Sequence, residues 1–117
     1  MKIGELITGA LSGLGLPVAE KLYEGDENEY ITYNLADDIG TDYGDNVPGT
    51  NTVFIQVHYV CPWLNDYYQT KRLIRELLYK ADFTWPEITD VSDAGARMRH
   101  FVFECSIDND YDLSEEN

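Results

Sequence analysis

Histidine and cysteine are the side chains of this 117-residue chain that could bind a metal or act as nucleophiles, and there are two of each. His58 and His100 stand in segments that alternate like β-strands, so they can face each other across neighbouring strands. A zinc site needs further ligands at suitable spacing, and the sequence places none beside them. Cys61 and Cys105 have no C-x-x-C partner and lie on the apolar side of their segments. We therefore predict two buried thiols, and two half-exposed histidines that line a surface.

A glycine-rich run and an aspartate-rich run suggest nucleotide and calcium binding, but each fails on its context. Residues 9–15 contain G-x-x-x-G-x-G within and after a helical pattern, whereas a phosphate loop joins a strand to a helix. Residues 108–112 carry aspartate at every second position, as an EF-hand loop does, but Leu113 takes the place of the required glycine. No Ser–His–Asp or Cys–His arrangement can be identified. The sequence predicts no catalytic residue, no cofactor and no metal, and therefore a protein that is not an enzyme.

One surface feature does stand out. Tyr68, Arg72, Arg75 and Tyr79 follow one another at spacings of four, three and four residues, which places them along one side of a helix. We call these four residues the Tyr–Arg ridge. Tyrosine and arginine are the residues that most often anchor protein interfaces, and neighbouring Lys71 adds a third base. We predict that the ridge contacts another subunit; the alternative is that its side chains only cover the edge of a sheet.

The ridge and His58 belong to one strand–helix tandem, residues 52–83, around which the chain is organised. Alternating residues predict a strand that ends at Pro62, which has no N–H to continue a ladder. Its inward residues are Val53, Ile55, Val57, Tyr59 and Cys61, and its outward residues are Phe54, Gln56, His58 and Val60. A helix capped by Asn65 or Asp66 should follow. Its predicted buried stripe is Tyr67, Thr70, Leu73, Ile74, Leu77, Leu78 and Ala81.

Other elements are predicted on both sides of this tandem. Residues 3–14 repeat at helical spacing, with Gly13 or Gly15 as the stop. An extended exit should then dock Leu16, Val18 and Leu22 on the core, before a solvated acidic turn at residues 24–29. Residues 30–34 predict a first strand, residues 87–91 a weak strand and residues 97–107 a strong one. In the strong strand Phe101, Phe103, Cys105 and Ile107 should face inward, and His100, Val102, Glu104 and Ser106 outward.

Acidic residues gather in two segments that we predict to be irregular. Residues 35–51 combine glycine, proline and aspartate without a base, which indicates a long loop. Connections of this length are usually functional or disordered. Its candidate contact residues are Asp37, Asp38, Asp42, Tyr43 and Asp45. Residues 108–117 hold five acids and no base and are predicted to be a disordered tail, so that the domain proper is residues 1–107.

The predicted order is helix, strand, strand, helix, strand, strand, which indicates a single α+β domain. Two hairpins joined by a helix favour a four-stranded, mainly antiparallel sheet with both helices packed on one face. The second face would stay bare and carry Gln56, His58, Val60, His100, Val102 and Glu104. A half-apolar bare face is a candidate for contact with another subunit.

The charge balance limits the choice of partners. With 8 basic and 22 acidic residues the net charge is −14, so direct binding to nucleic acid or to an anionic membrane is disfavoured. No apolar run is long enough to span a bilayer, and the first residues make a poor signal peptide. Free thiols fit synthesis in a reducing cytoplasm. Because the ridge is basic and the loops are acidic, we predict head-to-tail self-association into a ring or a filament.

Five segments carry a family resemblance: LGLPVAEKLY, EYITYN, VFIQVHYVCP, KRLIRELLYKADF and RHFVFECSI. Through them, over most of residues 1–107, the chain resembles the small tail terminator proteins of long-tailed bacteriophages and prophages, also described as minor tail, minor capsid or head–tail joining proteins. The resemblance implies an α+β subunit that forms a ring, typically a hexamer, without cofactor or catalytic residues. Such a ring caps the tail tube and ends its polymerisation.

The implied partners are other copies of the chain, the major tail tube protein and a head–tail connector or completion protein. The implied location is the virion, at the head–tail interface, after synthesis in the cytoplasm of the bacterial host. The acidic loop would suit a lumen or an end face, where acid lets DNA slide without sticking.

Three alternatives remain open. A head–tail joining protein of another type would have similar size. An acidic DNA mimic that inhibits a DNA-binding protein would need carboxylates along regular elements, whereas here the central helix is net basic and the acids are predicted in loops. A small enzyme or ligand-binding domain would need a convergent polar site, which the sequence does not show. Ring-shaped particles would favour the terminator, and capture of DNA-binding proteins would favour the mimic.

Overall fold

Two long antiparallel strands form the centre of the fold, as the alternating patterns predict. In the computed structural model, which describes residues 3–40 and 51–109, strands β3 (Asn51–Pro62) and β5 (Met98–Asn109) pair along their whole length. Val57 faces Phe103 and Tyr59 faces Phe101 in this register, and all four side chains are buried. The predicted inward faces of both strands are therefore confirmed.

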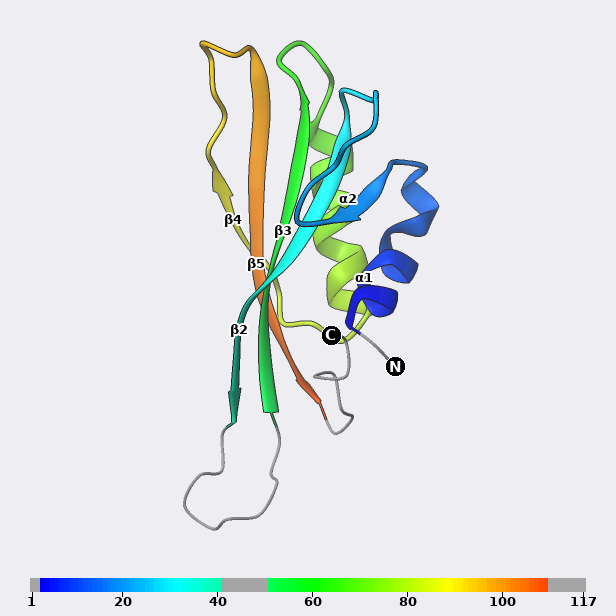
Figure 1. Cartoon of the computed structure of the whole chain (residues 1–117), viewed down its shortest axis with the longest axis vertical. Helices are drawn as coiled ribbons and strands as arrows, with labels where there is room; N and C mark the ends of the chain where they lie inside the picture. Colours follow the sequence, from blue (N-terminus) through cyan, green and yellow to red (C-terminus); the bar gives the residue numbers. More distant parts are fainter. Residues whose placement is uncertain (1–2, 41–50, 110–117) are drawn as a thin grey trace.

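The sheet has five strands, one more than predicted, in the order β1-β2-β3-β5-β4 (Figure 1). β2 (Tyr30–Gly40) pairs with β3, and β4 (Glu87–Asp90) pairs with β5, both antiparallel. The extra strand, β1 (Val18–Glu20), runs parallel to β2. Its three residues are too few to show alternation, so only pairing with β2 reveals it. The α+β class and the two hairpins joined by a helix are as predicted.

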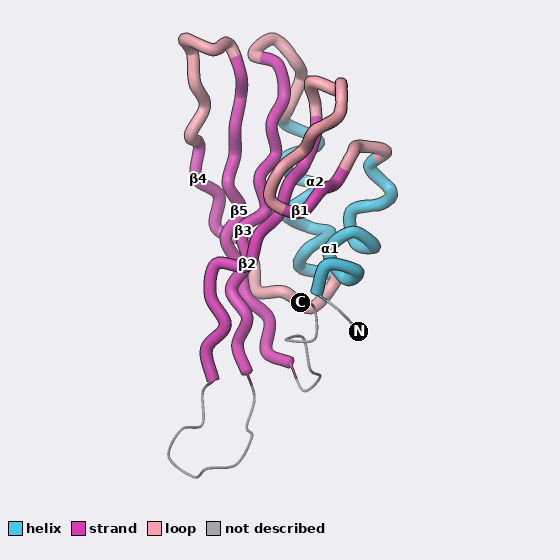
Figure 2. The backbone as a smooth tube through the Cα atoms, viewed as in Figure 1, coloured by secondary structure: helices cyan, strands magenta, loops and turns pink. Residues whose placement is uncertain are grey.

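Two helices cover one face of this sheet. α1 (Ile3–Leu11) continues into a 3-10 turn, η1 (Ser12–Leu14), and stops at Gly15, whose φ of 73° is a left-handed conformation that glycine adopts at low cost. α2 (Tyr68–Lys80) buries Ile74 and Leu78 completely. Figure 2 shows both helices on the same side of the sheet. In the part of the chain that the structure describes, neither helix has the length and apolar character that are needed to cross a membrane.

The structure corrects several local predictions. Tyr67 occupies the N-cap of α2 without a side-chain hydrogen bond, so neither Asn65 nor Asp66 caps the helix. Leu73 and Leu22, predicted to pack on the core, are 43% and 66% exposed. A single helix turn presents only a narrow stripe to the sheet, and Ile74 rather than Leu73 lies on its centre line.

The strands β2, β3 and β5 extend past the helices at one end of an elongated molecule of 52 × 23 × 22 Å (Figure 2). β2 continues to Gly40, through residues that were predicted to form a loop. It does so because β3 supplies a partner for each residue from Asp37 to Gly40, after a bulge between Leu35 and Asp37. β5 likewise continues into the predicted tail, where Thr52 Oγ1 donates to Asp108 Oδ1 at 2.7 Å. In both places cross-strand pairing overrides weak strand propensity.

Candidate functional site

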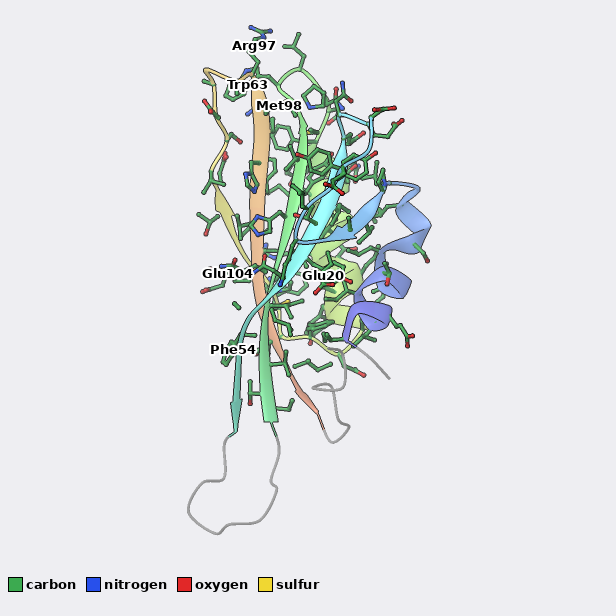
Figure 3. The ribbon with its side chains drawn as sticks, in the orientation of Figure 1. Glu20, Phe54, Trp63, Arg97, Met98 and Glu104 are labelled. Atoms are coloured by element: carbon green, nitrogen blue, oxygen red, sulfur yellow. The ribbon has the colours of Figure 1, made fainter. Side chains whose placement is uncertain are left out.

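The face of the sheet that the helices leave uncovered carries the side chains predicted for it. Gln56, His58 and Val60 of β3 and Val102 of β5 are half-buried, and Glu104 is exposed. Figure 3 shows Phe54 and Glu104 on the side of the sheet away from the helices. We call this surface the uncovered face.

A chain of hydrogen bonds crosses three strands on the uncovered face. His58 Nδ1 lies 2.9 Å from His100 Nε2, and His58 Nε2 lies 3.1 Å from Asn34 Oδ1. Asn34 Nδ2 then donates to Gln56 Oε1 at 3.3 Å, and Gln56 Nε2 donates to Glu104 Oε2 at 3.0 Å. The two histidines therefore do face each other, an arrangement that the sequence left open. The geometry links five polar side chains from β2, β3 and β5 into one chain.

The proton positions in this chain follow from the acceptor at its centre. The amide oxygen of Asn34 can only accept, so His58 carries its hydrogen on Nε2. Nδ1 of the neutral His58 ring is then an acceptor, and His100 Nε2 donates to it. Burial lowers the pKa of His58 and the nearby His100 lowers it further. Burial also lowers the pKa of His100, against an opposing effect of Asp90. The pair is therefore neutral at pH 7.

The uncovered face is hollowed next to the histidines into a pocket of about 290 Å³, which we call the histidine pocket. Its lining residues are Lys21, Leu22, Tyr23, Tyr30, Thr32, His58, Val60 and His100. Among the described residues, no group of three or more His, Cys, Asp or Glu side chains could hold a metal ion. The chemistry that this pocket offers is hydrogen bonding and positive charge.

A second pocket, of about 460 Å³, lies farther along the sheet and is bounded by aromatic and acidic side chains. Phe54 and Trp85 line it and are 39% and 51% exposed. Glu87 and Glu104 line it as well. Two exposed aromatic rings beside carboxylates make a surface suited to contact with another protein.

The Tyr–Arg ridge lies on α2, and its two ends behave differently. At the N-terminal end Tyr68 is 57% exposed, and the Arg72 guanidinium lies 5.9 Å from its ring. Arg72 Nη2 is also 3.5 Å from Glu76 Oε2, and both of these side chains are about half exposed. This end of the ridge faces outward and can contact a partner.

The other end of the ridge is bound to the segment that joins α2 to β4. Arg75 Nε donates to the Pro86 carbonyl at 2.8 Å, and its guanidinium lies 4.8 Å from the Trp85 ring centre. Tyr79 packs edge-on against the same indole at 5.3 Å. Lys71 is turned toward Phe101, with its ammonium 4.8 Å from the ring centre. Arg75 and Lys71 therefore make contacts within the chain, as the alternative interpretation of the ridge expected.

The acidic residues selected from the sequence fall in two places. Asp37 and Asp38 belong to β2, not to a loop. Asp42, Tyr43 and Asp45 lie outside the described residues.

Both thiols are free and buried, as predicted. Burial raises the pKa of Cys105 to about 12 and also raises the pKa of Cys61. Next to Cys61 the buried Tyr59 hydroxyl donates to Glu29 Oε2 at 2.6 Å. The pKa of Tyr59 is raised mainly by burial, and this hydrogen bond raises it further. Glu29 was predicted in a solvated turn, yet it satisfies a buried hydroxyl at the edge of the core.

Sequence reasoning missed Asn34, Lys21 and Tyr30 as residues of the uncovered face. Thr32 and Asn34 lie on the side of β2 opposite to the buried Ile31, so the alternation in the sequence could have predicted that both face outward. Lys21 had no such signal, because its position depends on β1.

No family model matches this sequence, and no curated protein matches it. Among solved structures, the fold is similar to that of a chain described as "Virion of native gene transfer agent (GTA) particle". The TM-score is 0.48 at 12% sequence identity, over 86% of this chain and 84% of that chain.

Proposed function

We propose that this chain is a structural subunit of a phage-like particle, of the tail terminator type, which assembles head to tail into a ring and performs no catalysis. The observation that carries this proposal is the uncovered face: in the part of the chain that the structure describes, one side of a five-stranded sheet has no helix on it and presents exposed aromatic and hydrogen-bonded polar side chains. An antiparallel sheet can leave one face to water, but this face is half-apolar, and a half-apolar face suits an interface.

The molecule offers two different surfaces for a heterologous contact. The uncovered face and the outward end of the ridge, Tyr68 and Arg72, lie on opposite sides of the sheet, because the helices cover the other face. When the uncovered face of one subunit meets the ridge of the next, the contact repeats in one direction, and it forms a ring where the rotation between subunits closes. The resemblance to tail terminators supports a ring of this kind, with six subunits as the family's usual number.

In this role the ring would bind the end of the tail tube and a head–tail connector or completion protein, within the virion. The net charge of −14 disfavours direct binding to DNA, which fits a conduit through which DNA passes. Membrane binding is not part of the proposal.

The test combines imaging with a charge reversal on the ridge. Negative-stain images and light scattering of the full chain should show ring-shaped oligomers. Arg72→Glu should abolish them, because it removes a basic anchor from the contact, whereas Lys80→Glu, which makes the same charge change at the end of the same helix, should leave them intact. A chain that stays monomeric at high concentration and low salt, or rings that survive Arg72→Glu, would contradict this proposal.

An acidic DNA mimic is a second candidate, favoured by one structural observation. Glu87, Asp90 and Glu104 lie on strands β4 and β5, in segments that were predicted to be strands, and Asp108, which was predicted in the tail, lies on β5 as well. Carboxylates on regular elements are what such a mimic needs. Specific capture of a DNA-binding protein by the full chain, reversed by added DNA, would support the mimic over the ring.

A further inference from the structure

Among the described residues that line the histidine pocket none is acidic, although the chain has 22 acids and only 8 bases. They instead include Lys21, two histidines, two tyrosines and Thr32. The second pocket, on the same molecule, is lined by Glu87 and Glu104. An acid-free cluster of donors is therefore a local exception to the charge of the whole chain.

Several of these donors have hydrogens directed by the contacts that they already make. The Tyr23 hydroxyl accepts the backbone N–H of Glu27 at 3.1 Å, so its own hydrogen is available to donate. Tyr23 stacks on Tyr30 with ring centres 4.8 Å apart, which forms a rigid aromatic wall. The Thr32 side chain at the base is only 9% exposed. The pocket is thus built from groups held by neighbours, which favours binding.

Lys21 is placed at the rim by an unusual backbone conformation. Its φ is 66°, a left-handed value that a residue with a side chain adopts at a cost, and its N–H donates to the Tyr33 carbonyl at 2.8 Å. The following N–H, that of Leu22, donates to the Glu20 carbonyl at 2.7 Å. β2 therefore holds the start of the lysine side chain beside the pocket.

We propose that the histidine pocket binds the carboxylate of an aspartate or glutamate side chain from a second copy of this chain. The inference rests on the proposed self-assembly and names the surface that completes it on the uncovered face. A carboxylate accepts from ammonium and hydroxyl donors, which Lys21, Tyr23, Tyr30 and Thr32 carry, whereas the ring N–H groups of His58 and His100 are already used within the hydrogen-bond chain. A volume of about 290 Å³ lies below the range of most cofactor sites and fits a single side chain.

Charge decides between sources of the anion. A nucleic-acid phosphate would have to approach a molecule with a net charge of −14, which repels it over its whole length. In the proposed ring the uncovered face is already held against the next copy, so one acid of that copy can enter the pocket without that long-range penalty.

The direct test uses a carbodiimide, which joins an amine to a carboxylate only where the two are in contact. An equal mixture of unlabelled and ¹⁵N-labelled full-length chain is treated under assembling conditions and digested, and the linked peptides are identified by mass spectrometry. We expect Lys21 to be joined to an acidic residue of a second copy, shown by mixed-isotope pairs. Lys21 joined only within its own chain, or unlinked while Lys71 or Lys80 is linked, would overturn the inference.

A pair of charge reversals gives the energetic test. Lys21→Glu should weaken self-association by about tenfold or more, because it places an acid against the incoming carboxylate. Arg97→Glu is the matched control: Arg97 is also exposed and has φ of 57°, but it lies at the tip of the β4–β5 turn (Figure 3), so its reversal should leave association within about twofold of the wild type.

Equal effects of these two variants would overturn the inference, even if rings form. Lys21-linked dimers without rings would support carboxylate binding in the histidine pocket and would contradict only the proposed ring. Inorganic phosphate is the competing probe: if 10 mM phosphate abolishes the mixed-isotope Lys21 link while equal ionic strength of sodium chloride and of sodium acetate does not, the pocket prefers a free phosphate and the proposal fails.

Discussion

The two faces of strand β3 come from alternate residues of one short segment, yet they serve different ends. On the covered face Val57, Tyr59 and Cys61 are fully buried under the helices. On the uncovered face the polar atoms of Gln56 and His58 belong to a hydrogen-bond chain that includes Asn34, His100 and Glu104. The first face is held by apolar area and the second by directed bonds.

This difference shows how a small domain can hold a stable core and still leave a large face free for the proposed contact. Because the side chains of a strand alternate, the residues of the proposed interface are not the residues that build the core. The polar chain also keeps the uncovered face ordered without a covering layer. Four changes test this division, from the largest expected effect to the smallest.

Phe103 and Val102 are neighbours on β5 that point to opposite faces. Phe103→Ala should lower the free energy of unfolding by about 3–5 kcal/mol, because it leaves a cavity in the core. Val102→Ala should cost under about 1.5 kcal/mol, since that side chain is only half-buried. Urea unfolding followed by circular dichroism measures both. Similar losses for the two variants would mean that the uncovered face carries as much of the stability as the core.

Burial raises the pKa of Cys105 to about 12, from an ordinary value near 9. Above pH 9 the unfolded chain loses this proton and the folded chain keeps it, so the free energy of unfolding falls as the pH rises. Between pH 8 and pH 11 the wild type should lose about 2–3 kcal/mol more than Cys105→Ala, which has no thiol to ionise. Urea unfolding at both pH values measures this difference. Identical losses in the two proteins would show that the thiol is accessible to solvent in the folded state.

Arg75 and Arg72 lie on the same helix but differ in their partners. Arg75→Ala should cost about 1–2 kcal/mol, because it removes the bond to the Pro86 carbonyl and the contact with Trp85. Arg72→Ala should cost under about 0.5 kcal/mol, since its ion pair with Glu76 is half-exposed. Thermal unfolding of each variant as a monomer provides the comparison. A larger loss for Arg72 would reverse our assignment of the two ends of the ridge.

The histidine pair makes the uncovered face sensitive to acid. Burial lowers the pKa of both rings below 6.5, so as the pH falls through 6.5 the unfolded chain takes up protons before the folded chain does. The contribution of the pair to the free energy of unfolding is therefore fully present above pH 7 and is lost as the pH is lowered toward 5. Asp90, which faces His100 from β4, has a lowered pKa and contributes only at more acid pH.

His100→Gln should flatten this dependence, because glutamine can still donate to His58 Nδ1 but does not titrate. Unfolding by urea at pH 7 and pH 5 measures the slope. An unchanged slope in the variant would assign the acid sensitivity to groups outside the pair.

The sequence by itself determined the α+β class, both hairpins, the inward faces of β3 and β5 and the buried thiols, and it allowed His58 to meet His100. The inward faces and the buried thiols follow from local alternation over eight or more residues, and burial of one face enforces it. A register shifted by one residue would expose Val57 and bury His58.

Only the tertiary structure decided which short or polar segments join the sheet and where the long side chains go. Residues 18–20 become β1 because β2 offers an edge, and β2 runs through Asp37 and Asp38 because β3 supplies its ladder partners. Arg75 turns to Pro86, and Glu29 to Tyr59, because those partners arrive from distant parts of the chain. Strand pairing and side-chain hydrogen bonding depend on neighbours in space, which local sequence patterns do not encode.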